Sequence, residues 1–245
     1  NDADRVAELF EQQGEQIACL IVEPVAGNMG CIPPVEGFLP RLRQLCDQYG
    51  VLLIFDEVMS GFRVAPGGAQ QRYGVVPDLT TLGKVIGGGL PIGAFGGRQQ
   101  VMQQLAPVGP VYQAGTLSGN PLATAAGITT LQLLLEPGRF EQIEQAATRL
   151  VDGIRALATK HAIPLQVNQA GTMFGLFFTD QPNVTDYHGA TACDTRRYAQ
   201  LFHRLLSAGV YLAPSAYETA FLSAAHGAEE LEQTLQAFDS VLAVL

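Results

Sequence analysis

The chain has 245 residues and a formal net charge of −9, with 47% hydrophobic and 15% charged residues. These values are typical of a globular chain and argue against disorder, and the negative charge argues against a surface for nucleic acid or anionic membrane. The four cysteines form no CxxC pair and the four histidines are scattered, so we expect neither a metal site nor disulfides. Reduced cysteines suggest a cytoplasmic protein, and no apolar run reaches membrane-spanning length.

The first part of the sequence predicts a βαβ unit. Residues 17–22 and 51–55 are apolar runs without alternation, as expected of parallel strands that are covered on both faces. Residues 37–49 between them have helical spacing, which Gly50 ends. A strand, a helix and a strand of these lengths predict a parallel sheet with a right-handed crossover.

The rest of the chain predicts a second, smaller domain. The expected elements are a glycine-rich strand at 92–97, a helix that starts at Pro121 and is capped by Asn120 or Ser118, helices at 140–161, 194–208 and 228–245, and strands at 165–167, 173–178 and 210–212. Glu136-Pro137-Gly138 interrupts the helical pattern, so we expect domains of residues 1–137 and 138–245. The predicted fold class is α/β: part of a mostly parallel, helix-flanked sheet domain followed by a smaller α+β domain.

Lys84 is the more informative of only two lysines in the chain. Lys160 is predicted near the end of an amphipathic helix, where a solvated cation is favourable. Lys84 lies in the uncharged stretch 80–89, where burial would lower its pKa and make it an amine nucleophile toward an aldehyde. A phosphate contact or a solvated loop is the alternative. A Walker P-loop is excluded, because Val85 replaces the required Ser or Thr.

Asp56 directly follows the apolar run 51–55 and is therefore expected at the carboxyl edge of the sheet, where ligands of open α/β sheets bind. The alternative is an Asp that caps the next turn. An Asp there with a lysine downstream is the pair that a pyridoxal cofactor requires, because the carboxylate keeps the pyridine nitrogen protonated and the lysine carries the aldehyde. Val58 would then face the ring, since residues two apart on an extended segment share a side.

Three further polar segments are weaker candidates. Asn28 lies in a glycine-flanked turn after Glu23-Pro24, and turn chemistry alone would explain it. Residues 115–121 combine hydroxyls, backbone amides and a helix start, which suits a phosphate but is also an ordinary helix start. Glu218 would by default be a solvated loop carboxylate.

Together these segments resemble the class III (ω-amino) aminotransferase family of fold-type I pyridoxal-phosphate enzymes. The matching elements, in the order of the family, are Glu23-Pro24, Phe55-Asp56-Glu57-Val58 with Gly61-Phe62-Arg63, Leu82-Gly83-Lys84, Gly87-Gly88-Gly89-Leu90-Pro91 and Gly115-Thr116. The resemblance covers essentially the whole chain, and several motifs in one order are more specific than any one alone.

Details of the motifs resemble the glutamate 1-semialdehyde aminomutase branch. Ala26 and Asn28 stand where ordinary members have Gln and Glu, and Pro33-Pro34 follows. The segments Asp56–Val64 and Gly115–Pro121 are also similar to that branch, although Ser60 is more commonly Thr. This resemblance implies conversion of glutamate 1-semialdehyde to 5-aminolevulinate in tetrapyrrole synthesis, in the cytoplasm or in the plastid stroma of a plant.

The resemblance also implies roles for the candidate residues. Lys84 would hold pyridoxal or pyridoxamine phosphate and move protons, Asp56 would pair with the pyridine nitrogen, and Val58 would pack on the ring. Asn28 would lie near the ring hydroxyl, Thr116 would bind the cofactor phosphate of the neighbouring subunit of a homodimer, and Glu218 would influence the substrate end. The implied partners are a small-molecule substrate and glutamyl-tRNA reductase.

The N-terminal part of the family has no counterpart in this sequence. We therefore expect the remaining strands and substrate groups elsewhere in the molecule, and exposed apolar sheet surface in this chain. Two alternative hypotheses are an ω-aminotransferase with an amine donor and a keto-acid acceptor, and a cofactor-free fragment that serves as an interaction partner.

Overall fold

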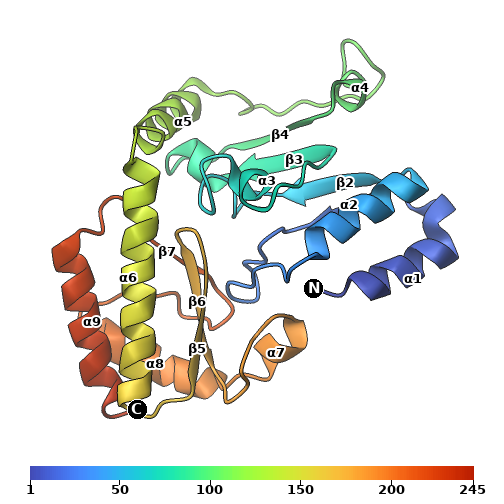
Figure 1. Ribbon diagram of the computed structural model, residues 1–245. Helices are drawn as coiled ribbons and strands as arrows, with labels where there is room; N and C mark the ends of the chain where they lie inside the picture. The colour runs from blue at the N-terminus through green and yellow to red at the C-terminus, as the bar shows by residue number, and fades with distance from the viewer. The chain divides into compact units, whose positions relative to one another are not determined.

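The computed structural model describes residues 1–245, which divide into two compact units (Figure 1). The first unit comprises Asn1–Pro24 and Val35–Glu136, and the second comprises Val25–Pro34 and Pro137–Leu245. The chain therefore passes into the second unit at Pro137. The short segment Val25–Pro34 also belongs to the second unit, which the sequence did not indicate.

The first unit is built on a four-stranded sheet with the order β1-β2-β3-β4 (Figure 1). The strands are β1 Cys19–Val22, β2 Leu52–Asp56, β3 Leu79–Gly83 and β4 Gly93–Gly97. β1, β2 and β3 are parallel, whereas β4 runs antiparallel to β3. This arrangement confirms the α/β class and the mostly parallel sheet, and it adds β3, which was not predicted as a strand.

The first unit also contains helices. They are α1 Ala3–Gln13, the 3-10 helix η1 Gly14–Gln16, α2 Phe38–Tyr49, α3 Gly68–Tyr73, the 3-10 helix η2 Lys84–Gly87, α4 Gln99–Met102 and α5 Pro121–Leu134. α2 ends as predicted at Gly50, whose φ of 69° is favourable for glycine. Asn120 caps α5 by accepting a hydrogen bond from the amide of Ala123, which confirms one of the two predicted caps.

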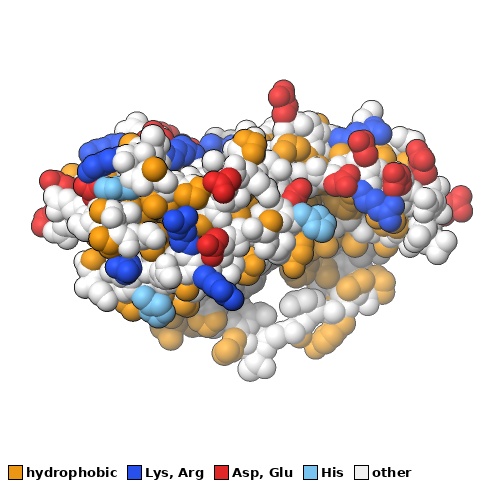
Figure 2. Space-filling model, turned by 90° about the horizontal axis from the view of Figure 1, so that it is seen from below, with side chains coloured by type: hydrophobic (Ala, Val, Ile, Leu, Met, Phe, Trp, Pro, Cys, Tyr) orange, Lys and Arg blue, Asp and Glu red, His pale blue; other side chains and the backbone are white.

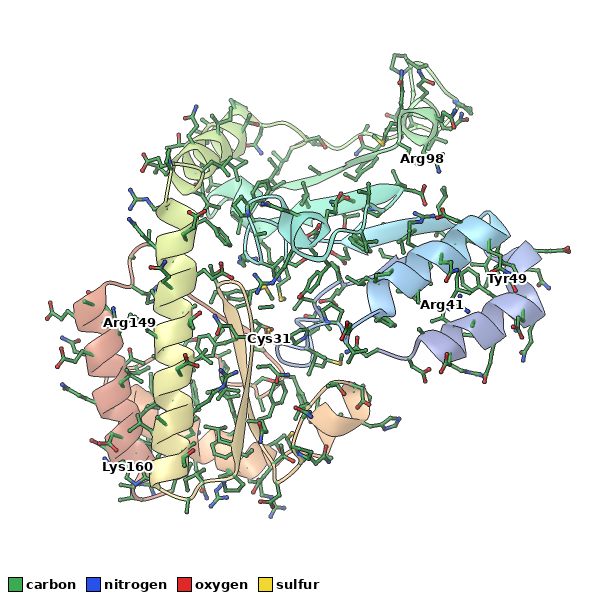
Figure 3. All side chains as sticks on the ribbon, in the orientation of Figure 1. Cys31, Arg41, Tyr49, Arg98, Arg149 and Lys160 are labelled. Atoms are coloured by element: carbon green, nitrogen blue, oxygen red, sulfur yellow. The ribbon has the colours of Figure 1, made fainter.

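The core of the first unit lies between α1, α2 and one face of the sheet. Phe10 and Tyr49 meet edge to face with ring centroids 5.5 Å apart, and Figure 3 shows Tyr49 at the end of α2 beside α1. Leu53 and Phe55 of β2 point into the same core. On β1 the opposite face is open, and Ile21 is 59% exposed. The prediction that β1 is covered on both faces was therefore wrong. The exposed apolar surface of the sheet agrees with the other expectation from the sequence.

The second unit contains an antiparallel three-stranded sheet and four helices, consistent with an α+β arrangement. The elements are α6 Arg139–Lys160, β5 Leu165–Ala170, β6 Met173–Phe178, α7 Tyr187–Thr191, α8 Thr195–Ser207, β7 Ala220–Phe221 and α9 Ala228–Leu242. The strand order is β5-β6-β7, and all six residues of β6 are buried. A continuous buried strand explains why residues 173–178 show no polar alternation.

The strand predicted at 210–212 is wrong. Gly209, with a φ of 87°, turns the chain after α8, and the amide of Val210 donates to the carbonyl of Leu205. Tyr211 is then 75% exposed and has no neighbouring strand to pair with. β7, at Ala220–Phe221, pairs with β6 instead.

The segment Val25–Pro34 packs against β6 through two glycines. A Cβ atom on Gly175 would lie 2.6 Å from the amide nitrogen of Cys31, and one on Gly30 would lie 2.6 Å from the ring of Phe177. Asn168 on β5 donates from Nδ2 to the carbonyl of Cys31 at 3.0 Å. The two glycines thus allow close packing of this segment against β6, and the hydrogen bond from Asn168 holds it in the second unit.

Surface charge in the described chain is mixed. Lys160 at the end of α6 (Figure 3) pairs with Asp239 on α9 at 2.8 Å, so this lysine has a structural ion pair. Acidic side chains, with basic ones among them, lie at the right of the view in Figure 2, where α1 lies in Figure 1. None of the helices combines the length and the apolar character needed to cross a bilayer.

Candidate active site

The carboxylate of Asp56 lies at the end of β2, opposite Thr81 of β3 in the parallel register. Its Oδ1 atom accepts two hydrogen bonds, from the Thr81 hydroxyl at 3.2 Å and from the Val58 amide at 3.1 Å. Oδ2 accepts none. The structure therefore holds Asp56 at the carboxyl edge of the sheet with one oxygen available to a donor, as a ligand site in an open α/β sheet requires.

Val58 and Gly83 form a second contact between the loop after β2 and the end of β3, next to Asp56 and Thr81. A Cβ atom on Gly83 would lie 3.2 Å from Cγ1 of Val58, so the absence of a side chain lets Val58 approach β3. Lys84 follows Gly83 directly, which brings the lysine backbone close to both Asp56 and Val58. Asp56, Val58 and Lys84 thus share one edge of one sheet.

Lys84 opens η2 with a positive φ of 50°. This left-handed conformation costs a non-glycine residue roughly 1–2 kcal/mol. The Lys84 side chain is exposed, and its ammonium makes no hydrogen bond or ion pair. The burial of Lys84 that its apolar sequence surroundings suggested is therefore not observed.

α5 holds the turn that carries Lys84. Gly127 on α5 is so close to η2 that a Cβ atom there would lie 2.0 Å from the carbonyl oxygen of Ile86. The segment before α5 is a compact turn, in which the Ser118 amide donates to the Gly115 carbonyl at 3.0 Å. Thr116 lies in this turn, exposed and with its hydroxyl free. The lysine turn and the Thr116 turn therefore flank a single helix.

A buried network of hydrogen bonds supports the chain after Asp56. Glu57 is 1% exposed, and its carboxylate accepts from the Ser60 hydroxyl, the Ala69 amide and Gln70 Nε2. Gln70 also donates to Thr80 Oγ1 on β3 at 3.0 Å. Glu57 is thus a structural carboxylate that fixes the loop between β2 and α3, and not a surface charge.

Asn28 and Glu218 occupy neighbouring segments of the second unit. Residues 213–219, here called the Glu218 loop, are joined to the segment Val25–Pro34 by two hydrogen bonds. The Gly30 amide donates to the Tyr217 carbonyl at 2.7 Å, and the buried Thr219 hydroxyl donates to the Gly27 carbonyl at 3.0 Å. Asn28 and Glu218 are both exposed. The structure therefore brings together two candidates that are separated by most of the chain.

The residues that support these candidates do not stand out in the sequence. Thr81 and Gln70 were not singled out, because β3 was not recognised and nothing local marks a glutamine on α3. Two β-branched threonines that directly precede Leu82-Gly83 were a signal for a strand. Thr219 had no local signal at all, since its partner Gly27 is 192 residues away.

Known proteins match this chain along nearly its whole length. Residues 2–242 match the class-III aminotransferase family. An ω-transaminase from Sphaerobacter thermophilus is 32% identical, with a TM-score of 0.90, and the match covers 98% of this chain and 55% of that one. A β-phenylalanine aminotransferase from Variovorax paradoxus is 35% identical, with a TM-score of 0.87 and the same coverage of 98% and 55%.

A third similar structure is a glutamate-1-semialdehyde aminomutase from Pseudomonas aeruginosa PAO1 in complex with PMP. It is 28% identical, with a TM-score of 0.87, and the match covers 99% of this chain and 55% of that one. The chain thus spans about 55% of the length of each of these three proteins. The chain belongs to the class-III aminotransferase family.

The residues of this chain fit the cofactor that family membership and cofactor-bound neighbours support, pyridoxal or pyridoxamine phosphate. The test is chemical. The cofactor needs an amine for its aldehyde and a carboxylate for its pyridine nitrogen. Lys84 has an unpaired ammonium, and Asp56 has a free Oδ2 at the same sheet edge.

Proposed function

We propose that the protein is a pyridoxal-phosphate-dependent aminomutase that converts glutamate 1-semialdehyde, (S)-4-amino-5-oxopentanoate, into 5-aminolevulinate. The observation that carries the cofactor chemistry is the pair formed by Asp56 and Lys84 at adjacent strand ends. The aminomutase itself is supported by the motif around Ala26 and Asn28 and by the similar aminomutase structure. The net reaction exchanges an amino group and an oxo oxygen between neighbouring carbons, so no external donor is consumed.

In this proposal each residue has a role that follows from its position. When bound, the cofactor supplies an electron sink for negative charge on the carbon that carries the amine. Asp56 Oδ2 would accept a hydrogen bond from the pyridine nitrogen, and Val58 would pack on the ring. Lys84 would move the proton between the substrate carbon and the cofactor, acting as base and then as acid. An exposed, unpaired amine suits this transfer.

The remaining roles lie at the ends of the cofactor. Asn28 would donate to the ring hydroxyl, and Glu218 on the neighbouring segment would act at the substrate end. Thr116 would bind the cofactor phosphate, together with the amides at the start of α5, because a helix N-terminus favours negative charge. These assignments rest on the family resemblance, and all three residues are exposed.

We also propose that Thr116 serves the neighbouring subunit of a homodimer. The segment around it is unusually apolar for a surface. Tyr112, Leu117 and Leu122 are 83%, 70% and 75% exposed. Exposed apolar side chains of this density are typical of an interface. A contact with glutamyl-tRNA reductase, which the sequence resemblance implied, remains a prediction.

The experiment uses the enzyme at its natural length, loaded with pyridoxamine phosphate and given glutamate 1-semialdehyde without donor or acceptor. We expect 5-aminolevulinate to form over many turnovers. The matched control is Lys84→Ala, which should abolish turnover and keep the fold, because it removes an exposed amine and no core volume.

The alternative is an ω-aminotransferase that uses an amine donor and a keto acid. It is favoured by the 32% and 35% identities to two aminotransferases, which exceed the 28% identity to the aminomutase. A single stoichiometric burst of product, restored by adding an amine donor or a keto acid, would establish this alternative and rule out the aminomutase.

A further inference from the structure

Two successive threonines of β3 have different partners. Side chains of neighbouring strand residues point to opposite faces of a sheet. Thr80 Oγ1 accepts a hydrogen bond from Gln70 Nε2 at 3.0 Å, whereas Thr81 Oγ1 donates one to Asp56 Oδ1 at 3.2 Å. Only Thr81 therefore contacts a residue of the proposed cofactor site.

Thr81 also holds Asp56 through the backbone. Its carbonyl accepts from the Glu57 amide at 3.0 Å, and its register position is directly opposite Asp56. The hydroxyl and the carbonyl of one residue thus fix both the side chain of Asp56 and the peptide that follows it. No other side chain donates to the Asp56 carboxylate.

The geometry leaves the two carboxylate oxygens unequal. Oδ1 accepts from two donors on different segments, the Thr81 hydroxyl and the Val58 amide, and Oδ2 accepts from none. The terminal torsion of an aspartate is broad and poorly restrained by itself. Two donors that converge on one oxygen remove this freedom and leave the other oxygen oriented.

We infer that Thr81 is a positioning residue of the cofactor site: its hydroxyl orients Asp56 so that Oδ2 is presented to the protonated pyridine nitrogen. This inference rests on the proposed function. Thr81 itself does not touch the cofactor. It acts by reducing the reorganisation that Asp56 undergoes when the cofactor binds, which strengthens a charge-assisted hydrogen bond.

The test is the affinity of the enzyme at its natural length for pyridoxal phosphate, measured by titrating the apoenzyme and following the absorbance of the bound cofactor. Thr81→Val keeps the shape of the side chain and removes the donor. We expect the dissociation constant to rise roughly tenfold, the scale of one hydrogen bond to a charged group. Thr81→Ser restores the donor and should stay within about threefold of the wild type.

Thr80→Val is the matched control, since it makes the same change one residue away and on the opposite face. We expect it to leave cofactor affinity unchanged. The substrate KM of Thr81→Val should stay near the wild-type value while kcat falls, because the substrate-binding groups are untouched.

Three results would overturn the positioning role of Thr81. Unchanged cofactor affinity in Thr81→Val, or equal losses in the Thr80 and Thr81 valine variants, would overturn the positioning role and leave the proposed function standing. Failure of Thr81→Ser to recover affinity would also overturn it. If the wild-type enzyme binds no pyridoxal phosphate at all, the proposed function falls and this inference falls with it.

Discussion

The hydroxyl of Tyr198 donates a hydrogen bond to the carbonyl oxygen of Ala213 across 2.7 Å. Tyr198 lies buried on α8, and Ala213 is the first residue of the Glu218 loop. One end of that loop is therefore anchored by Tyr198, and the other end is anchored by the bond from Thr219 to Gly27. A carboxylate that is itself exposed is thus carried by a loop with two fixed ends.

Replacing Tyr198 by Phe should destabilise the fold by about 1 kcal/mol, the net value of one hydrogen bond. Burial, and then the charge of Glu218, raise the pKa of Tyr198 to about 12. Because the folded pKa exceeds the unfolded value of about 10, the wild type should lose stability as the pH rises from about 10 to 12. Tyr198→Phe should lack this loss in urea unfolding at each pH.

The control for that comparison is Tyr211→Phe. Tyr211 is 75% exposed and its hydroxyl makes no hydrogen bond, so the change should leave stability within about 0.5 kcal/mol of the wild type. A Tyr198→Phe variant with the same alkaline loss as the wild type would contradict the assignment of that loss to Tyr198.

Lys84 should lower the stability of the fold through backbone strain. Its φ of 50° suits glycine better than any other residue. We therefore expect Lys84→Gly to be more stable than Lys84→Ala by about 1 kcal/mol, with both inactive. Thermal unfolding of the two apoenzymes measures the difference.

The other lysine provides the matched pair. Lys160 is the last residue of α6, where the backbone is helical, so Lys160→Gly should be less stable than Lys160→Ala. An order of stability at position 84 that equals the order at position 160 would show that Lys84 carries no backbone strain.

Asp78 should make the first unit sensitive to acid. Its carboxylate, 3% exposed, accepts from Arg43 and Arg98 and from the Leu53 amide, each at 2.7 Å. Burial alone would raise the pKa of Asp78, but the hydrogen bonds from Arg98, the Leu53 amide and Arg43 outweigh it and hold the pKa below its usual range. Asp78→Asn should cost roughly 2–3 kcal/mol at neutral pH.

The sign of the pH dependence follows from that direction. A lowered pKa gives stability that is present above the unfolded value of about 4 and is lost as the pH falls through the folded value. The gap between the wild type and Asp78→Asn should therefore narrow below about pH 4. Asp47→Asn, on an aspartate whose side chain is 66% exposed, should show a much smaller gap at every pH, and a gap for Asp78→Asn that widens in acid would refute this account.

Gly127→Ala should be destabilising even though alanine favours helices. The added Cβ would meet the carbonyl oxygen of Ile86 at 2.0 Å, and a backbone atom cannot turn aside as a side chain can. We expect a net loss of roughly 1–3 kcal/mol by thermal unfolding, together with weaker cofactor binding. Ala125→Ser on the exposed side of α5 should change neither, and a stable Gly127→Ala variant would mean that α5 and η2 do not pack tightly.

Sequence patterns correctly predicted the helices and strands whose own side chains show a clear apolar pattern. The apolar runs that became β1 and β2, and the spacing of α2, needed no knowledge of distant residues. Their ends differed by one or two residues, as at β1, which begins at Cys19 and not at residue 17.

Elements defined by distant partners were missed. β3 contains two threonines and a glycine, and it is a strand because β2 and β4 flank it. The β-branched Val210 favoured a strand that has no partner in the fold. The placement of Val25–Pro34 depends on Gly175 and Asn168, which follow it by more than a hundred residues. The candidate site shows the same difference: Asp56 and Lys84 stand out in the sequence through their motifs, whereas Thr81 does not.

The close approach of Gly127 to Ile86 packs the middle of α5 directly against η2, the turn that begins at Lys84. In the proposed homodimer, Thr116 in the turn before α5 would bind the cofactor phosphate of the neighbouring subunit. Lys84 would bind the cofactor of its own subunit. A displacement of η2 in one subunit would then reach the phosphate held by the other subunit through α5 and the turn that precedes it. In the proposed homodimer, Gly127 would therefore couple the two cofactor sites.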